Sequence, residues 1–336
     1  MKFGPVPLDE AEGAILAHSV GTASGRLRKG QRLTATQLDQ MRAEGLAEVI
    51  CARLDPGDVG EDEAAARLAR ALVPDPAAAH LRLTDPFTGR VNLIADVAGV
   101  VDLDVAAITA LNRIDPMLTV ATVPQMQQMT SGGMVATIKV ISYAVPGAAV
   151  AEAEALLRDR TALRLRPVCL QSARLIVTTI PGGAGEKGVK AIAARLEALG
   201  MTLTDTVTVP HREDDLSAAL TAASDADMTL ILTGSATSDA QDVAPAALRH
   251  AGGQVERFGM PVDPGNLLFV GDLAGQPVIG LPGCARSPAL NGADWVLSRI
   301  ACGVPVTDSD IAGMGVGGLL KEIPTRPQPR AGRKSG

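Results

Sequence analysis

The feature that most constrains the fold of this chain is an alternation of apolar, strand-like segments with amphipathic helical segments, which begins near Gly147. The strand-like segments lie at 173–185, 201–210 and 228–234, and the helical segments at 148–160, 189–200, 212–224 and 242–252. Such an alternation is typical of a parallel α/β sheet covered by helices. We therefore predict a three-layer α/β domain with a mostly parallel sheet. Because ligands of such sheets bind at the carboxyl ends of the strands, a site is expected there.

The N-terminal half has a different texture, in which short extended pieces alternate with turns. A helix is predicted at 36–44, with Thr34 or Thr36 as its cap, and further helices at 60–73 and 101–114.

This change of texture divides the chain into three parts. We predict an α+β accessory region at 1–146 and the α/β domain at 147–310. A disordered tail is predicted at 323–336, whose composition is that of a linker.

The composition narrows the classes of function. A chain of 336 residues with 46% hydrophobic residues can bury a core and form two or more domains. Aromatic residues make up only 2%, which argues against a stacking surface for single-stranded nucleic acid. The net charge of −6, combined with a basic C-terminal end, argues against binding to a phosphate backbone. Because the apolar runs are also too short to span a bilayer, we expect neither nucleic acid nor a membrane as partner.

Cysteine and histidine usage adds two expectations. The cysteines form no CxxC pair and lie far apart, at Cys51, Cys169, Cys284 and Cys302. Together with an N-terminus that lacks an apolar signal region, this spacing predicts a cytoplasmic protein. The histidines are equally scattered, at His18, His80, His211 and His250. They are expected on the surface or as satisfied core residues, and no transition-metal cluster is visible.

Small and polar residues follow the strand-like segment at 228–234. The loop contains Gly234, Ser235, Thr237 and Ser238, and Asp242 stands at the start of the next helical segment. Small residues let backbone N–H groups approach an anion closely, and the helix N-terminus favours negative charge. A side chain at Gly234 would fill the space that the anion needs. The alternative is that Asp242 is a helix N-cap and the hydroxyl residues are turn residues.

A second loop of the same kind follows at 281–287. It contains Pro282, Gly283, Cys284 and Ser287, and it leads into another helical segment. Two such loops at one edge of a sheet could hold a phosphorylated ligand between them.

With these motifs in place, residues 173–306 resemble the molybdopterin-binding domain of molybdenum-cofactor biosynthesis proteins of the MoaB/Mog and MoeA type. The N-terminal half resembles the MoeA-type accessory region more loosely. The matching positions form four motifs in the same order as in the family: Asp214 and Asp215; Gly234, Thr237 and Asp242; Pro264 and Gly265; and Leu281, Pro282, Gly283 and Ser287.

The resemblance implies a protein that binds molybdopterin or a nucleotide form of it and serves cofactor biosynthesis or maturation. It implies ligand-binding roles for Gly234, Ser235, Thr237, Ser238, Pro282, Gly283, Cys284 and Ser287. It implies a catalytic role and a Mg²⁺ site at Asp242, assisted by Asp214 or Asp215. The implied partners are the pterin phosphate and a molybdopterin nucleotidyltransferase or a molybdoenzyme maturation factor, and a homo-oligomer stays open.

Several positions depart from the family pattern. Ser235 and Asp239 stand where the family has glycines, Asn266 where it has lysine, and Cys284 and Ala285 where it has asparagine and proline. An acid at 239 would repel a phosphate unless a cation bridges them, and the missing lysine removes a charge-assisted donor. Binding is therefore favoured over turnover. Whether the chain is an enzyme stays open, with a Mg²⁺-dependent molybdopterin molybdotransferase as the alternative.

Two further alternatives come from other residues. Gly183, Gly185 and Gly188 spell GxGxxG between a strand-like and a helical segment, which would suit an NAD(P)-dependent enzyme. This alternative ranks lower, because the acid at about the right distance, Asp205, lies in the middle of its strand-like segment. Cys284 beside a helix N-terminus could be a nucleophile, but no histidine lies near it in the sequence.

Overall fold

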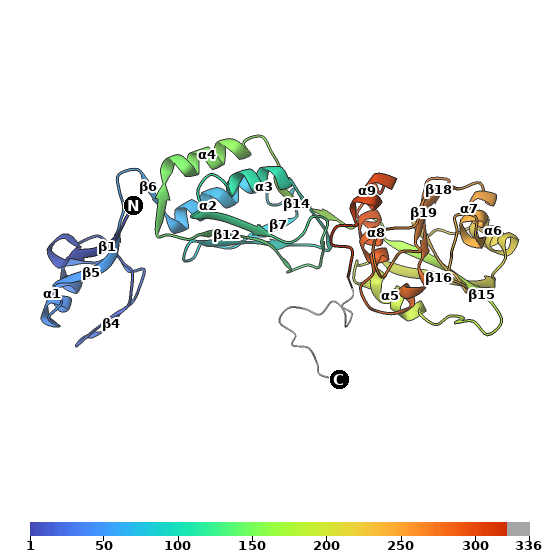
Figure 1. The fold of residues 1–336 in the computed structure, drawn as a ribbon, viewed down its shortest axis with the longest axis horizontal. Helices are drawn as coiled ribbons and strands as arrows, with labels where there is room; N and C mark the ends of the chain where they lie inside the picture. Colours follow the sequence, from blue (N-terminus) through green and yellow to red (C-terminus); the bar gives the residue numbers. More distant parts are fainter. Residues whose placement is uncertain (321–336) are drawn as a thin grey trace. The chain divides into compact units, whose positions relative to one another are not determined.

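The computed structural model describes residues 1–320 and divides them into two compact units (Figure 1). The first unit comprises Met1–Val97, Val101–Gln125 and Ser131–Leu165, and the second comprises Ala98–Val100, Met126–Thr130 and the chain from Arg166 onward. Within the described residues, no helix has the length and apolarity needed to cross a membrane. The tail predicted at 323–336 lies outside the described residues.

The second unit is built on a six-stranded sheet in the order β16-β15-β17-β20-β19-β18. In chain order the strands are β15 (Ser172–Thr179), β16 (Thr202–Pro210), β17 (Met228–Leu232), β18 (Gln254–Phe258), β19 (Phe269–Leu273) and β20 (Gln276–Leu281). Strand β15 pairs in parallel with β16 and β17, and β17 pairs in parallel with β20. Strand β19 pairs antiparallel with β20, and β18 pairs antiparallel with β19. The predicted mostly parallel sheet is confirmed, with an antiparallel hairpin added at one side.

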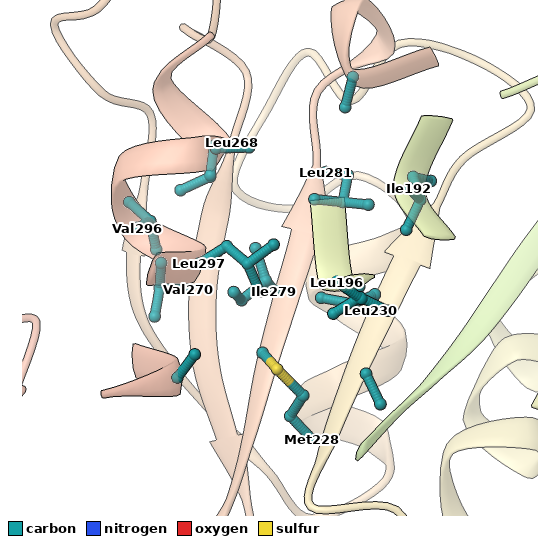
Figure 2. Packing of buried hydrophobic residues seen from close by; sticks show 14 of the residues in the cluster. Ile192, Leu196, Met228, Leu230, Leu268, Val270, Ile279, Leu281, Val296 and Leu297 are labelled. Carbon is teal, nitrogen blue, oxygen red and sulfur yellow. The ribbon is translucent and has the colours of Figure 1, made fainter. Parts of the chain in front are cut away.

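Helices cover both faces of this sheet. They are α5 (Val189–Glu197), α6 (Glu213–Thr221), α7 (Val243–His250), α8 (Gly292–Ala301) and α9 (Asp308–Gly313), with a short 3-10 helix η2 (Gly283–Arg286). Side chains of α5, α8 and α9 share one buried cluster with the strands, to which Ile192, Leu196 and Leu230 belong (Figure 2). Side chains of α6 and α7, such as Leu216 and Leu248, share a second cluster with other strand residues. The two separate clusters confirm the three-layer arrangement.

Strand β16 is an edge of the sheet. It pairs with β15, and among the described residues no strand lies on its other side. Its residues are exposed or half-buried throughout, and Asp205 in its middle is exposed. The parallel pairing ends at Pro210, after which His211 and Arg212 lead into α6.

The first unit is rich in antiparallel strands. Its strands are β1 (Lys2–Pro7), β2 (Ile15–Leu16), β3 (Val20–Thr22), β4 (Gly25–Leu27), β5 (Glu48–Arg53), β6 (Asp58–Gly60), β7 (Leu81–Leu83), β8 (Arg90–Ala95), β10 (Leu118–Thr122), β12 (Met134–Val140) and β13 (Ala144–Pro146). They form sheets in the orders β1-β5-β2, β10-β12-β8-β7, β13-β6 and β3-β4. A further small sheet has the order β11-β9-β14, with β9 at Gly99–Leu103, β11 at Gln128–Met129 and β14 at Leu163–Pro167. The residues through which β9 and β11 pair belong to the second unit.

The helices of the first unit are η1 (Leu8–Glu10), α1 (Ala35–Ala43), α2 (Glu61–Leu72), α3 (Val105–Leu111) and α4 (Gly147–Leu157). Helix α1 begins after Thr34, whose side chain accepts from the N–H of Gln37 in a capping box. The helix predicted at 101–114 is shorter, because residues up to Leu103 belong to β9 and Asp104 caps α3.

Helix α4 belongs to the first unit, although the sequence placed it with the α/β domain. Arg67 of α2 donates to both carboxylate oxygens of Glu154 of α4, at 2.8 and 2.7 Å. Val150, Ala153 and Leu157 of α4 are buried. In the structure the first unit therefore extends to Leu165 rather than ending before Gly147.

Candidate functional site

Three loops meet at the carboxyl ends of neighbouring parallel strands. They follow β15 at 180–188, β17 at 233–242 and β20 at 282–291. Because β15, β17 and β20 are adjacent and parallel, all three loops start at the same edge of the sheet. This is the edge at which the sequence predicted a site.

The loop after β17, which we call the first loop because it was the first to be predicted, packs closely against β15 at Gly234. The N–H of Gly234 donates to Thr178 Oγ1 at 2.9 Å. A Cβ at Gly234 would lie 2.7 Å from the backbone oxygen of Thr178 and 3.1 Å from the nitrogen of Ile180. The backbone φ at Gly234 is not in the left-handed region. Glycine is thus required here by close backbone approach, and an added side chain would meet β15 rather than fill space left for an anion.

Thr178 connects this loop to His211. The hydroxyl of Thr178 is fully buried and lies 2.8 Å from His211 Nδ1. His211 also lies near enough to Asp242 to favour its charged form. His211 is half-buried, and the sequence treated it as an isolated histidine. Its position directly after the strand-like segment 201–210, at the ligand-binding edge of a parallel sheet, is the signal that could have identified it.

Asp242 caps α7 and organises the loop before it. Oδ1 accepts from the N–H of Val243 at 2.7 Å, and Oδ2 accepts from the N–H of Ser238 at 2.9 Å and from its hydroxyl at 3.4 Å. Partial burial alone would raise the pKa of Asp242, but these hydrogen bonds and nearby His211 bring it below its usual value. The carboxylate is therefore charged at neutral pH. The helix-cap role considered from the sequence is present.

Between these two anchors the loop offers backbone donors. Among residues 1–320, no acceptor binds the backbone N–H groups of Ser235, Ala236 or Thr237. Ser235 and Ser238 are exposed, whereas Thr237 is buried. Asp239, also exposed, accepts from the N–H of Gln241 at 2.7 Å. A run of free N–H groups in a fixed loop before a helix is suited to binding an anion.

The second predicted loop contains η2. Pro282 is buried, whereas Gly283 is exposed and a Cβ there would meet nothing within 4 Å. Cys284 is half-buried, and this burial raises the pKa of its thiol. A neutral thiol is a poor nucleophile, so the environment of Cys284 does not favour the catalytic alternative. Ser287 is exposed, and its hydroxyl accepts from the N–H of Ala289 at 3.3 Å.

Two arginines that the sequence reasoning missed hold the second loop in place. Arg195 of α5 forms an ion pair with Asp294 at 2.7 Å, and their side chains are 9% and 15% exposed. The guanidinium of Arg195 also donates to the carbonyl oxygens of Ala191, Ala285, Ser287 and Ala289, at 2.8 to 3.1 Å.

Arg286 of η2 reaches the other two loops. It donates to the carbonyl oxygens of Gly185 and Lys187 in the loop after β15, and to that of Thr233 after β17. Burial lowers the pKa of Arg286. A single long cation among small residues at 282–287 is the sequence signal for this role.

Asp214 and Asp215 have other partners. Asp215 accepts from Arg212 Nε at 2.5 Å. Asp214 lies 3.7 Å from His250 at the C-terminal end of α7, beside Glu213 at 3.2 Å from the same nitrogen. Together with Ala218 these acids line an open surface hollow. Within the described chain, no group of three or more His, Cys, Asp or Glu residues could hold a metal ion.

The GxGxxG segment forms the loop after β15. Gly188 precedes α5 with φ of +108°, and a Cβ there would lie 2.7 Å from the Cα of Arg286. The carbonyl groups of this segment at Gly185 and Lys187 are bound by Arg286. Gly188 thus accommodates the close contact with η2, whereas a Cβ at Gly185 would meet nothing within 4 Å.

Comparison with known families matches two parts of the chain. Residues 171–300 match the family described as a probable molybdopterin binding domain, and residues 5–53 match a domain of unknown function. A comparison with curated proteins found no match. The resemblance at 173–306 is confirmed by the first match, and the comparisons give the nicotinamide alternative no support.

Two solved structures from Pyrococcus horikoshii, both described as molybdopterin biosynthesis MoeA proteins, are similar to the chain. One is 15% identical, with a TM-score of 0.31, over 90% of this chain and 75% of that one. The other is 12% identical, with a TM-score of 0.27, over 93% of this chain and 75% of that one. At these identities and TM-scores, the two structures give no basis for a function of single residues. The match to a probable molybdopterin binding domain therefore rests on the family match at 171–300.

Proposed function

We propose that the probable molybdopterin-binding domain at 171–300 binds molybdopterin or a nucleotide form of it, and that the chain serves molybdenum-cofactor biosynthesis or maturation in the cytoplasm. One observation carries the proposal. The N–H groups of Ser235, Ala236 and Thr237 have no acceptor among the described residues, although Thr178 and Asp242 fix both ends of their loop. The phosphate of the pterin is a suitable acceptor for them.

The second loop provides further groups for the ligand. Gly283 lies in open space beside the half-buried Cys284, and the exposed hydroxyl of Ser287 follows. Because the thiol of Cys284 is neutral, we assign it contact with the ligand rather than nucleophilic attack.

The negative charge of the loop after β17 supports a bound cation. Asp242 is ionised, and Asp239 is exposed in the same loop. A ligand phosphate would be repelled by these carboxylates unless a cation lies between them. We propose that Asp242 would hold a Mg²⁺ ion beside the ligand, where the cation would offset the negative charge of the phosphate, because hard cations prefer anionic oxygen ligands.

Binding without rapid turnover is the form of the proposal that the side chains favour. Asp215 is paired with Arg212, and Asp214 lies beside His250. Both acids thus interact with basic side chains, and no contact joins either of them to Asp242 in the described chain. We propose that the loaded protein hands the cofactor to a molybdopterin nucleotidyltransferase or a molybdoenzyme maturation factor.

Calorimetry with molybdopterin, in Mg²⁺ and in EDTA, tests this function. The unmodified protein is expected to bind more tightly in Mg²⁺, and Asp242→Asn to lose that difference. Asp214→Asn is the matched control and is expected to keep it. AMP release from adenylylated molybdopterin with molybdate is expected to be slow or absent. Rapid release that Asp242→Asn abolishes would establish the molybdotransferase alternative, and failure of the unmodified protein to bind would refute the proposed function.

A further inference from the structure

We propose that Arg286 and Thr178 are positioning residues that clamp the peptide between Thr233 and Gly234 from opposite sides, and so fix the direction of the anion loop without contacting the ligand. The inference rests on the proposed function for its ligand. The clamp itself is a property of the free protein.

The two hydrogen bonds of the clamp use a single peptide group. Nη2 of Arg286 donates to the carbonyl oxygen of Thr233 at 2.8 Å, and the N–H of Gly234 donates to Thr178 Oγ1 at 2.9 Å. This C=O and N–H belong to one planar trans peptide, in which they point in opposite directions. Binding both ends therefore fixes the rotation of the plane, and with it the direction in which the chain leaves β17.

Arg286 extends this constraint to the neighbouring loop. Its Nη1 donates to the carbonyl oxygens of Gly185 and Lys187, at 2.9 and 2.5 Å. The planar guanidinium presents these donors in one rigid fork. One side chain thus sets the spacing of the loops after β15, β17 and β20.

The clamp determines which groups stay available to a ligand. Arg286 binds carbonyl groups, and Thr178 binds only the first N–H of the loop, which leaves the N–H groups of residues 235–237 without an acceptor in the described chain. Preorganised donors bind an anion more tightly than donors that must be ordered on binding. Loss of either clamp residue is expected to weaken affinity although neither residue contacts the ligand.

The first test uses molybdopterin affinity in four variants. Thr178→Val keeps the shape but removes the acceptor, and is expected to weaken binding about tenfold. Thr178→Ser keeps the hydroxyl and is expected to stay within about twofold of the unmodified protein. Arg286→Met is expected to lose about tenfold. Arg249→Met is the control, because Arg249 donates to Ala240 in the same loop from an exposed position, away from the clamped peptide.

The second test needs no ligand. Hydrogen exchange of the Gly234 amide, followed in protein labelled with ¹⁵N-glycine, is expected to accelerate in Thr178→Val and to be preserved in Thr178→Ser. Equal exchange and equal affinity in these two variants would overturn the clamp even if Arg286→Met does not fold. If the unmodified protein fails to bind molybdopterin, the proposed function fails, and the exchange of Gly234 alone then decides the clamp.

Discussion

The loop after β17 and the loop after β20 look alike in sequence but are held by different side chains. In the first loop, side-chain oxygens of Thr178 and Asp242 accept from backbone N–H groups. Arg286 and Arg249 bind one carbonyl group of this loop each, at Thr233 and Ala240. In the second, the guanidinium of Arg195 donates to the carbonyl groups of three of its residues. Fixing a loop through its carbonyls leaves its N–H groups free, whereas fixing it through N–H groups uses some of the donors that an anion needs. The first loop retains free donors because these side chains bind it at 233–234 and at 238–242, which leaves the N–H groups of 235–237 without an acceptor among the described residues.

The largest expected difference between the loops concerns their glycines. Gly234→Ala is expected to destabilise the protein by about 2–4 kcal/mol, because its Cβ would lie 2.7 Å from the backbone oxygen of Thr178. Gly283→Ala is the matched change in the second loop and is expected to cost less than about 0.5 kcal/mol, since nothing lies within 4 Å of its Cβ. Urea denaturation of both variants measures the difference. Equal losses would mean that the first loop does not depend on close packing against β15.

Arg195 tests whether the second loop depends on its cation. Arg195→Met is expected to cost about 2–4 kcal/mol, because it removes bonds to four carbonyl groups and leaves Asp294 without its partner in a site only 15% exposed. The exposed Arg249→Met, which removes one bond to Ala240, is expected to cost below about 1 kcal/mol. Thermal and urea unfolding measure both losses. If the two variants are equally stable, the contrast between the loops disappears.

The smallest expected effect concerns Asp242. Asp242→Ala is expected to cost about 1 kcal/mol at pH 7 through loss of the cap, and Asp242→Asn only a few tenths. Because the folded state lowers the pKa of Asp242, its charge stabilises the protein above the unfolded value of about 3.9, and this contribution is lost as the pH falls through the folded pKa.

The gap between the unmodified protein and Asp242→Asn should therefore narrow when unfolding is measured at pH 3 instead of pH 7. A gap that widens at pH 3 would show that the carboxylate does not stabilise the loop in its charged form.

The strand–helix alternation from 173 onward was sufficient to predict the three-layer sheet, since each buried strand shows as an apolar segment. Helix α4 was assigned to the wrong neighbour, because helical periodicity reports that a face is buried but not which partner covers it. The pairing of Arg67 with Glu154 joins residues 87 positions apart, and no local pattern encodes it.

The site was predicted only in part, because a local sequence pattern does not show contacts between residues that are distant in the sequence. Asp242 is a local signal of a helix cap and has that role in the structure. The prediction for Gly234 was wrong, because glycine is required there by close approach to β15 rather than by space for an anion. Arg286, Arg195 and His211 were missed, because each acts on a loop or strand distant in sequence. The ligand-binding and catalytic roles assigned to the site residues stay predictions.

Strand β16 has a consequence for the behaviour of the protein in concentrated solution. A free parallel edge presents unpaired N–H and C=O groups that can template pairing with another chain. On β16 the exposed Asp205 stands near the middle of that edge. Two copies that joined through these edges in antiparallel fashion would bring two carboxylates close together, which repulsion between like charges opposes. Asp205 is thus placed where its charge opposes edge-to-edge aggregation of the sheet.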